Sequence, residues 1–233
     1  WGPSAPARAA WWLGSLAQLG VTVWVLARWW RGGPAADKAA GLQWPGITPV
    51  LFIPVVGNVL APLAGVPLGH EAWAAAQFGV GVLFWPVVLV LLGVRVAVQG
   101  LWPERLRPSV FIVIAPPAVV GLGLLQFGAP VLLAWACWGA ALFALLWAGT
   151  QLKAIAALPF ALPHWAMSFP LAAFAALSLR LATPGSAFSL LALALLALAS
   201  LVIAALLLAT LRGLRDGSLT APETVAVVQP AAA

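Results

Sequence analysis

The sequence has little charge, a single cysteine and no tyrosine. Charged residues make up 7% of its 233 residues, whereas a soluble domain carries roughly 25%. Hydrophobic residues make up 64%, more apolar surface than a water-soluble fold could bury. The lone Cys137 excludes a disulfide within the chain and a cysteine metal cluster. These absences predict an integral membrane protein, and we expect neither a metal nor a cofactor.

Tryptophan, in contrast, is abundant. Many of the 14 tryptophans lie near the ends of apolar runs, as an aromatic belt at the membrane interfaces requires. The formal net charge is +6, which could indicate a nucleic-acid partner. The lysines and arginines are scattered singly between apolar runs and form no patch, so we expect no nucleic acid and interpret them as topology signals.

Seven apolar runs approach the ~20 residues that a membrane-spanning helix needs. The predicted spans are residues 9–29, 47–64, 71–98, 109–127, 130–152, 163–181 and 187–211. They define an all-α transmembrane domain over residues 1–211. Residues 212–233 are polar and then rich in proline and alanine, so we expect a disordered cytoplasmic tail.

The basic residues are distributed unequally if the seven spans alternate in direction. One side would hold Arg28, Arg31, Lys38, Arg95, Arg105, Arg107, Lys153, Arg212 and Arg215, and the other only Arg8 and Arg180. Because connections rich in lysine and arginine stay in the cytoplasm, we expect a multi-pass protein of the cell membrane with its C-terminus inside. Short connections on the opposite side would pair the last six spans into three hairpins.

The first member of each predicted hairpin contains an internal proline. These are Pro54, Pro116 with Pro117, and Pro170, whereas the second members are more regular apart from Pro86. A proline within a helix frees a carbonyl group that lipid cannot satisfy, so such helices are buried in protein or line a wet path. Packing alone could explain one proline. Three at corresponding positions favour an inner layer of broken helices around a path, with the regular helices outside.

Polar side chains are few within the spans. Gln18, Asn58 and Ser168 are the notable ones, and no Asp, Glu, Lys or Arg falls clearly at a span centre. Proton-coupled carriers usually rely on buried ionisable relays, so this pattern favours a passive path. His164 and Ser168 are spaced like a base and a nucleophile, but no orienting residue or nucleophile elbow accompanies them, so we expect no enzyme.

Three segments together resemble one family: "PVLFIPVVGNVLAP" (49–62), "RPSVFIVIAPPAVVGLG" (107–123) and "HWAMSFPLAAFAALSLR" (164–180). They are similar to the tellurite-resistance/dicarboxylate transporter family, which contains TehA-like bacterial channels, plant slow-type anion channels and fungal malate and sulfite transporters. The resemblance implies ten helices as five hairpins with pseudo-fivefold symmetry around a central pore, in a homotrimer. The seven spans would be the fourth to tenth helices, so the first three would be missing from this sequence.

The resemblance also implies how the pore is gated. The family's pore is blocked by a phenylalanine on the ninth helix, and Phe169 occupies the matching position. We therefore expect a channel or facilitator for small anions, gated by Phe169. Its candidate pore-lining residues are Pro54, Gly57, Asn58, Pro116, Ser168 and Pro170. The alternative is a proton-coupled secondary transporter for C4-dicarboxylates such as malate, or for sulfite or tellurite-related anions.

Overall fold

The computed structural model describes residues 4–30, 41–217 and 219, and all regular elements within them are helices. Six helical segments in this part of the chain are long and apolar enough to cross a membrane. Four of them are α1 (Ala5–Trp29), α4 (Glu71–Gln99), α6 (Val131–Gly149) and α9 (Ala187–Arg215). The other two, Glu104–Gln126 and Leu162–Leu181, are each built from two helices. The predicted all-α membrane fold is confirmed.

The seventh predicted span, 47–64, corresponds to the shorter apolar segment Pro49–Gly65. This segment consists of four short pieces: a 3-10 helix at Pro49–Leu51, α2 (Phe52–Val56), a second 3-10 helix at Gly57–Leu60, and α3 (Ala61–Gly65). Proline lacks an N–H and glycine is a poor helix former, so frequent prolines and glycines prevent one continuous helix. A count of seven membrane spans therefore stays a prediction.

Several helix ends differ from the predicted ones. α6 ends at Gly149 and the short α7 (Leu152–Ala156) follows it, whereas the prediction ran on to residue 152. α9 continues to Arg215, beyond the predicted end at residue 211. Most of the predicted tail, and the part of the first connection that holds Arg31 and Lys38, lie outside the described residues.

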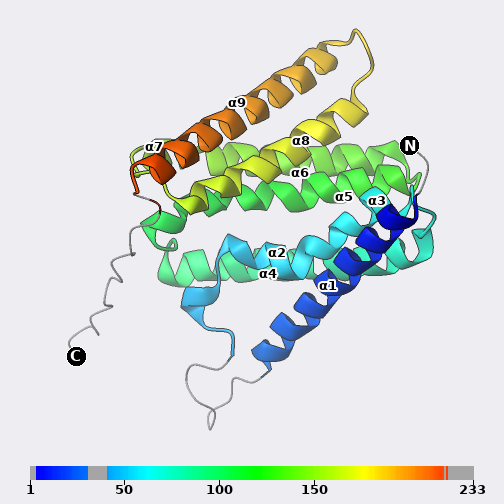
Figure 1. The fold of residues 1–233 in the computed structure, drawn as a ribbon, viewed down its shortest axis with the longest axis horizontal. Helices are drawn as coiled ribbons and strands as arrows, with labels where there is room; N and C mark the ends of the chain where they lie inside the picture. Colours follow the sequence, from blue (N-terminus) through cyan, green and yellow to red (C-terminus); the bar gives the residue numbers. More distant parts are fainter. Residues whose placement is uncertain (1–3, 31–40, 218, 220–233) are drawn as a thin grey trace.

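Three helical hairpins follow one another along the chain, as predicted. Pro49–Gly65 packs against α4, Glu104–Gln126 against α6, and Leu162–Leu181 against α9. Each hairpin turns beside a glycine with positive φ: Gly69 (82°), Gly128 (69°) and Gly185 (79°). Other residues adopt this backbone conformation at an energetic cost. In Figure 1 these turns lie at the right-hand end with the N-terminus, while α7 and the end of α9 lie at the left.

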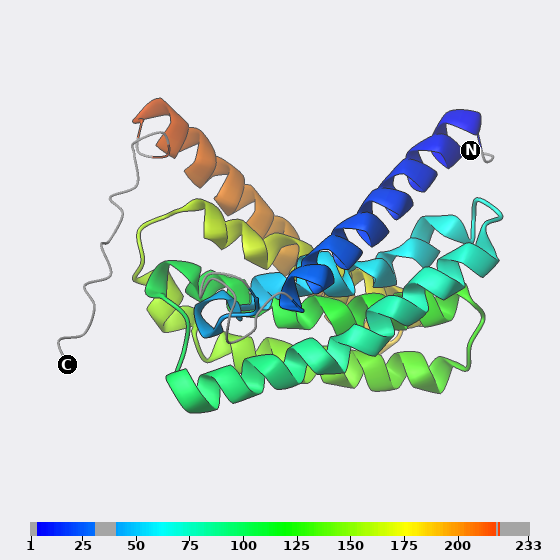
Figure 2. The same cartoon turned by 90° about the horizontal axis from the view of Figure 1, so that it is seen from below.

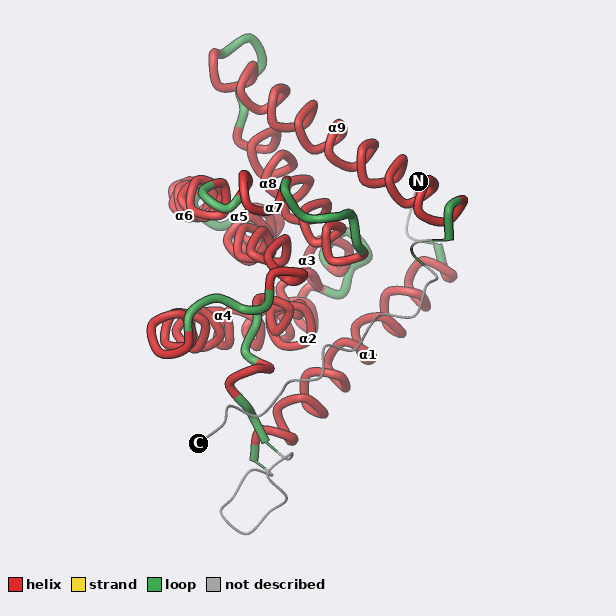
Figure 3. Tube along the Cα trace, turned by 90° about the vertical axis from the view of Figure 1, so that its left-hand side faces the viewer, coloured by secondary structure: helices red, strands yellow, loops and turns green. Residues whose placement is uncertain are grey.

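Burial separates the helices into an inner and an outer layer. In Glu104–Gln126, 83% of the most apolar stretch is buried, against 11–22% in α1, α4, α6 and α9. The inner segments contact one another through α5 (Ala115–Gln126) and α8 (Ser168–Leu181). Figure 3 looks nearly along α4, α5 and α6, and Figure 2 shows α1 and α9 diverging obliquely on opposite sides. The predicted inner position of the proline-containing segments is thus confirmed for the described residues.

Candidate functional site

The three inner segments share a change of helix type at their prolines. Each begins as a 3-10 helix and continues as an α-helix: α2 starts at Phe52, α5 at Ala115 and α8 at Ser168. Pro54, Pro116 and Pro170 therefore stand in the first turn of a new α-helix. A first-turn N–H has no partner within its own helix, so proline is tolerated there. The structure corrects the expected kink within a continuous helix, because each segment starts a new α-helix at its proline.

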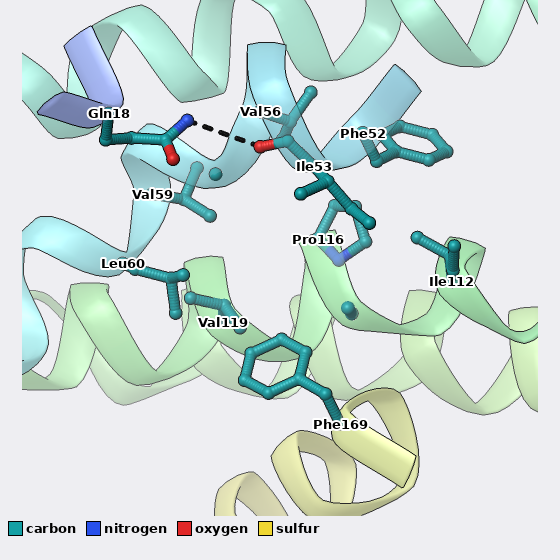
Figure 4. Close-up of a pocket in the computed structure, with 12 residues that line it drawn as sticks. Gln18, Phe52, Ile53, Val56, Val59, Leu60, Ile112, Pro116, Val119 and Phe169 are labelled. Carbon is teal, nitrogen blue, oxygen red and sulfur yellow. Dashed lines mark hydrogen bonds between the residues drawn. The ribbon is translucent and has the colours of Figure 1, made fainter. Parts of the chain in front are cut away.

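A cavity of about 290 Å³ lies between these α-helix starts. Its walls are mainly apolar side chains of the inner segments, including Phe52, Ile53, Val56, Val59, Leu60, Ile112 and Val119. The ring of Phe169 projects into this space from α8, opposite Ile53 and Pro116 (Figure 4). Phe169 remains 49% exposed although it sits on an inner helix, because its ring points into the cavity and not into the core.

A second cavity of about 390 Å³ adjoins the first. It lies toward the 3-10 halves of the inner segments and is lined by Val50, Leu106 and Ser109, among others. Ile53, Ile112 and Phe169 line both cavities. One aromatic and two aliphatic side chains therefore form the boundary between two successive spaces.

The predicted pore residues divide into two groups. Gly57, Pro116 and Phe169 line the first cavity, and Pro170 lines the second together with Phe169. Pro54, Asn58 and Ser168 line neither of these two cavities. The hydroxyl of Ser168 donates to the carbonyl of Trp165, in the 3-10 helix that precedes α8, at 2.7 Å.

Asn58 is fully buried and faces the outer helices instead of the cavities. Its Nδ2 donates to Thr22 Oγ1 at 2.7 Å and to the Val55 carbonyl at 3.1 Å. Its Oδ1 accepts from Gln77 Nε2 at 3.0 Å. The bonds to Thr22 and Gln77 hold the inner segment against α1 and α4, and the bond to Val55 lies within the segment. Asn58 was expected to line the path, and its amide is here satisfied by protein partners, as a buried amide within the membrane requires.

The sequence interpretation missed most of this polar network. Ser15 Oγ donates to Gln77 Oε1 at 2.5 Å, and Trp73 Nε1 donates to Ser15 Oγ at 2.7 Å. Thr22 Oγ1 lies within hydrogen-bonding distance of the Pro54 carbonyl, at 2.7 Å. The available signal was the spacing of Ser15, Gln18 and Thr22, which places three polar side chains on one face of an apolar helix.

The charged side chains that the structure describes lie away from both cavities. No ionisable side chain is among the described residues that line either one. Arg95 is buried at the end of α4, where its Nη1 donates to the Gly100 carbonyl at 2.8 Å. Arg107 pairs with Glu104 at 2.9 Å at the start of the second inner segment. These cations lie near helix ends, where the bias of basic residues places them.

The remaining candidate sites do not assemble. His164 Nδ1 lies 3.0 Å from the carbonyl of Ala161, and Ser168 bonds to Trp165. Neither interaction joins a base to a nucleophile, and a catalytic pair requires that bond. In the part of the chain that the structure describes, no cluster of three His, Cys, Asp or Glu residues could hold a metal ion.

Comparisons with known proteins agree with this architecture. A family model described as "Voltage-dependent anion channel" matches residues 3–211. The chain is 26% identical over 141 residues to the S-type anion channel SLAH3 of Arabidopsis thaliana, covering 58% of this chain and 21% of that protein. It is 24% identical over 158 residues to the S-type anion channel SLAH2 of the same plant, covering 67% of this chain and 29% of that protein. The chain thus spans less than a third of either relative.

Proposed function

We propose, because the chain belongs to the voltage-dependent anion channel family, that it conducts small anions across a membrane and that Phe169 gates the path. The observation that carries this proposal is the position of the Phe169 ring. It lies with Ile53 and Ile112 at the boundary of the two cavities between the inner segments. An apolar boundary of this kind excludes water and hydrated ions until the ring moves.

The uncharged lining supports a channel more than a tight binding site. Ions conduct only if they are held weakly enough to leave, and backbone dipoles and uncharged donors meet that need. Gly57 and Pro116 on the wall of the first cavity, and Pro170 on that of the second, would line the path beside Phe169. Asn58, Ser168 and Pro54 would support these walls from behind.

The proposed setting is the cell membrane, with the C-terminus in the cytoplasm. The connections that carry Arg95, Arg105, Arg107 and Lys153 would then face the cytoplasm, in agreement with the bias of basic residues. A homotrimer with one path per protomer is the assembly that the family resemblance implies. Crosslinking the purified protein in detergent would test the trimer.

Reversal potentials in planar bilayers test the function itself. With a potassium chloride gradient across the bilayer, the current should reverse close to the chloride equilibrium potential. Reversal at the potassium equilibrium potential, or no current from folded protein, would contradict the proposal.

Transport into proteoliposomes separates a channel from the alternative, a proton-coupled carrier for malate, sulfite or tellurite-related anions. A channel should continue to pass chloride after a protonophore has collapsed the proton gradient. Saturable malate uptake that stops when the protonophore is added would contradict the channel and support the proton-coupled carrier.

A further inference from the structure

Gln18 brings a polar side chain to the first cavity. Among the described residues that line this cavity, it alone has a polar side chain, and it reaches the wall from α1 in the outer layer. Its Nε2 donates to the carbonyls of Ile53 and Pro54, at 3.3 and 3.1 Å. Figure 4 shows the amide nitrogen directed at a backbone carbonyl on the cavity wall. The nitrogen must face these carbonyls, because the amide oxygen cannot donate to them.

A third cavity, of about 250 Å³, lies on the other side of this amide. Polar side chains of Ser15 and Gln77 contribute to its lining. It shares Gln18, Gly57 and Leu60 with the first cavity. The three spaces therefore form a series with two boundaries, one at Phe169 and one at Gln18. Of the described residues at these two boundaries, only Gln18 offers a side-chain hydrogen-bond donor.

Gly57 leaves room for the Gln18 amide. A Cβ added at Gly57 would lie 2.9 Å from Gln18 Nε2 and 3.2 Å from Gln18 Cδ. A side chain at this position would push the amide off its carbonyl partners. The close approach of the two residues thus fixes where the donor lies.

The amide can give up one bond without leaving Pro54 unpaired. Thr22 Oγ1 lies 2.7 Å from the Pro54 carbonyl and can donate to it when Gln18 does not. The bond to the Ile53 carbonyl is the longer one and is exposed. An N–H of Gln18 can therefore turn toward an acceptor in the cavity, while the Pro54 carbonyl of the inner segment keeps a hydrogen-bond donor in Thr22.

We propose that the Gln18 side-chain amide contacts the permeating anion and determines anion selectivity in this path. The inference rests on the proposed function. A neutral N–H donor favours an anion over a cation, because its positive end faces the ion. It also binds an anion more weakly than an arginine would, since only ionised donors add full charge to the bond, and weak binding allows the anion to leave.

Single-channel recording in potassium chloride tests this role, because unitary current does not depend on how many molecules fold. Gln18→Leu keeps the approximate volume and removes the donor. At chloride concentrations below saturation the unitary conductance should fall about tenfold, the effect of losing one hydrogen bond to a charged partner. The nitrate-to-chloride permeability ratio should also change. Gln126→Leu is the matched control, because Gln126 Nε2 only makes a 3.5 Å bond to the Leu63 carbonyl and lines none of the three cavities.

Gln18→Glu gives a second, independent readout, because the glutamate side chain has nearly the same shape as glutamine. A protonated carboxyl still donates, whereas an ionised one repels anions. Anion conductance of this variant should therefore fall as pH rises from about 4 to 8, around and above the usual carboxyl pKa, with no such fall in the parent protein. If both variants match the parent in unitary conductance and permeability ratio, Gln18 only supports the backbone and the inference is refuted. A parent protein without anion current would refute the proposed function instead.

Discussion

Replacing Asn58 with leucine separates a structural role from a pore-lining role. The substitution keeps the approximate volume and removes three hydrogen bonds, to Thr22, Val55 and Gln77. Side-chain hydrogen bonds within membranes average about 0.6 kcal/mol each, so three contribute about 2 kcal/mol. One N–H of Gln77 would also lose its partner in a buried position, which costs a further ~1–3 kcal/mol. We expect Asn58→Leu to lower the free energy of unfolding by about 3–5 kcal/mol.

Reversible unfolding in mixed micelles, followed by tryptophan fluorescence, measures this change. Gln126→Leu serves as the control, because its amide makes only one long hydrogen bond. The anion-to-cation permeability ratio of the molecules that fold should stay at the parent value, because Asn58 does not line the cavities at Phe169. Normal stability with altered selectivity would show that Asn58 faces the path and that its hydrogen bonds to Thr22 and Gln77 do not stabilise the fold.

Two further substitutions test the packing and the site. Gly81→Ala should destabilise the protein by about 1–3 kcal/mol in the same unfolding assay, because the new Cβ would lie 2.7 Å from Val59 N and 2.9 Å from Val56 O. Gly79→Ala on the same helix meets no atom within 4 Å and should be neutral or stabilising by up to ~1 kcal/mol; equal effects of the two would refute the close contact of α4 with the inner segment. Ser168→Ala should leave anion conductance unchanged, because the hydroxyl bonds to Trp165 within the same inner segment. A changed single-channel conductance would show that Ser168 lines the path.

The sequence was sufficient for the order of helices and for their layers. Long apolar runs identify both ends of α4 to within one residue and the start of α9, because hydrophobic length depends on composition alone. Corresponding prolines separated the inner segments from the outer ones, since a missing N–H is tolerated in few places within lipid. The change from 3-10 to α-helix at Ala115 and Ser168 could not be predicted, because it depends on which tertiary contacts satisfy the backbone.

The candidate site was only partly predictable. Phe169 was chosen through its match to a family position, and it lines the two cavities; its role as a gate stays a prediction. The hydrogen-bond partners of Asn58 could not be predicted, because a segment with mixed 3-10 and α geometry does not keep a fixed angle per residue. The direction that Asn58 faces therefore cannot be counted from Pro54. Gln18 reaches the wall of the first cavity because α1 packs obliquely against the inner segment. Residue spacing within one helix does not reveal such packing.

Phe169→Ala is the measurement that tests the central claim most directly. Removing the ring would widen the boundary between the cavities of about 290 and 390 Å³, where Ile53 and Ile112 would remain. Phe143→Ala, on the outer helix α6 where Phe143 is 69% exposed, is the matched control. In planar bilayers with a chloride gradient, we predict a larger anion current for Phe169→Ala than for the parent and the control. An unchanged current from folded protein would contradict gating at Phe169.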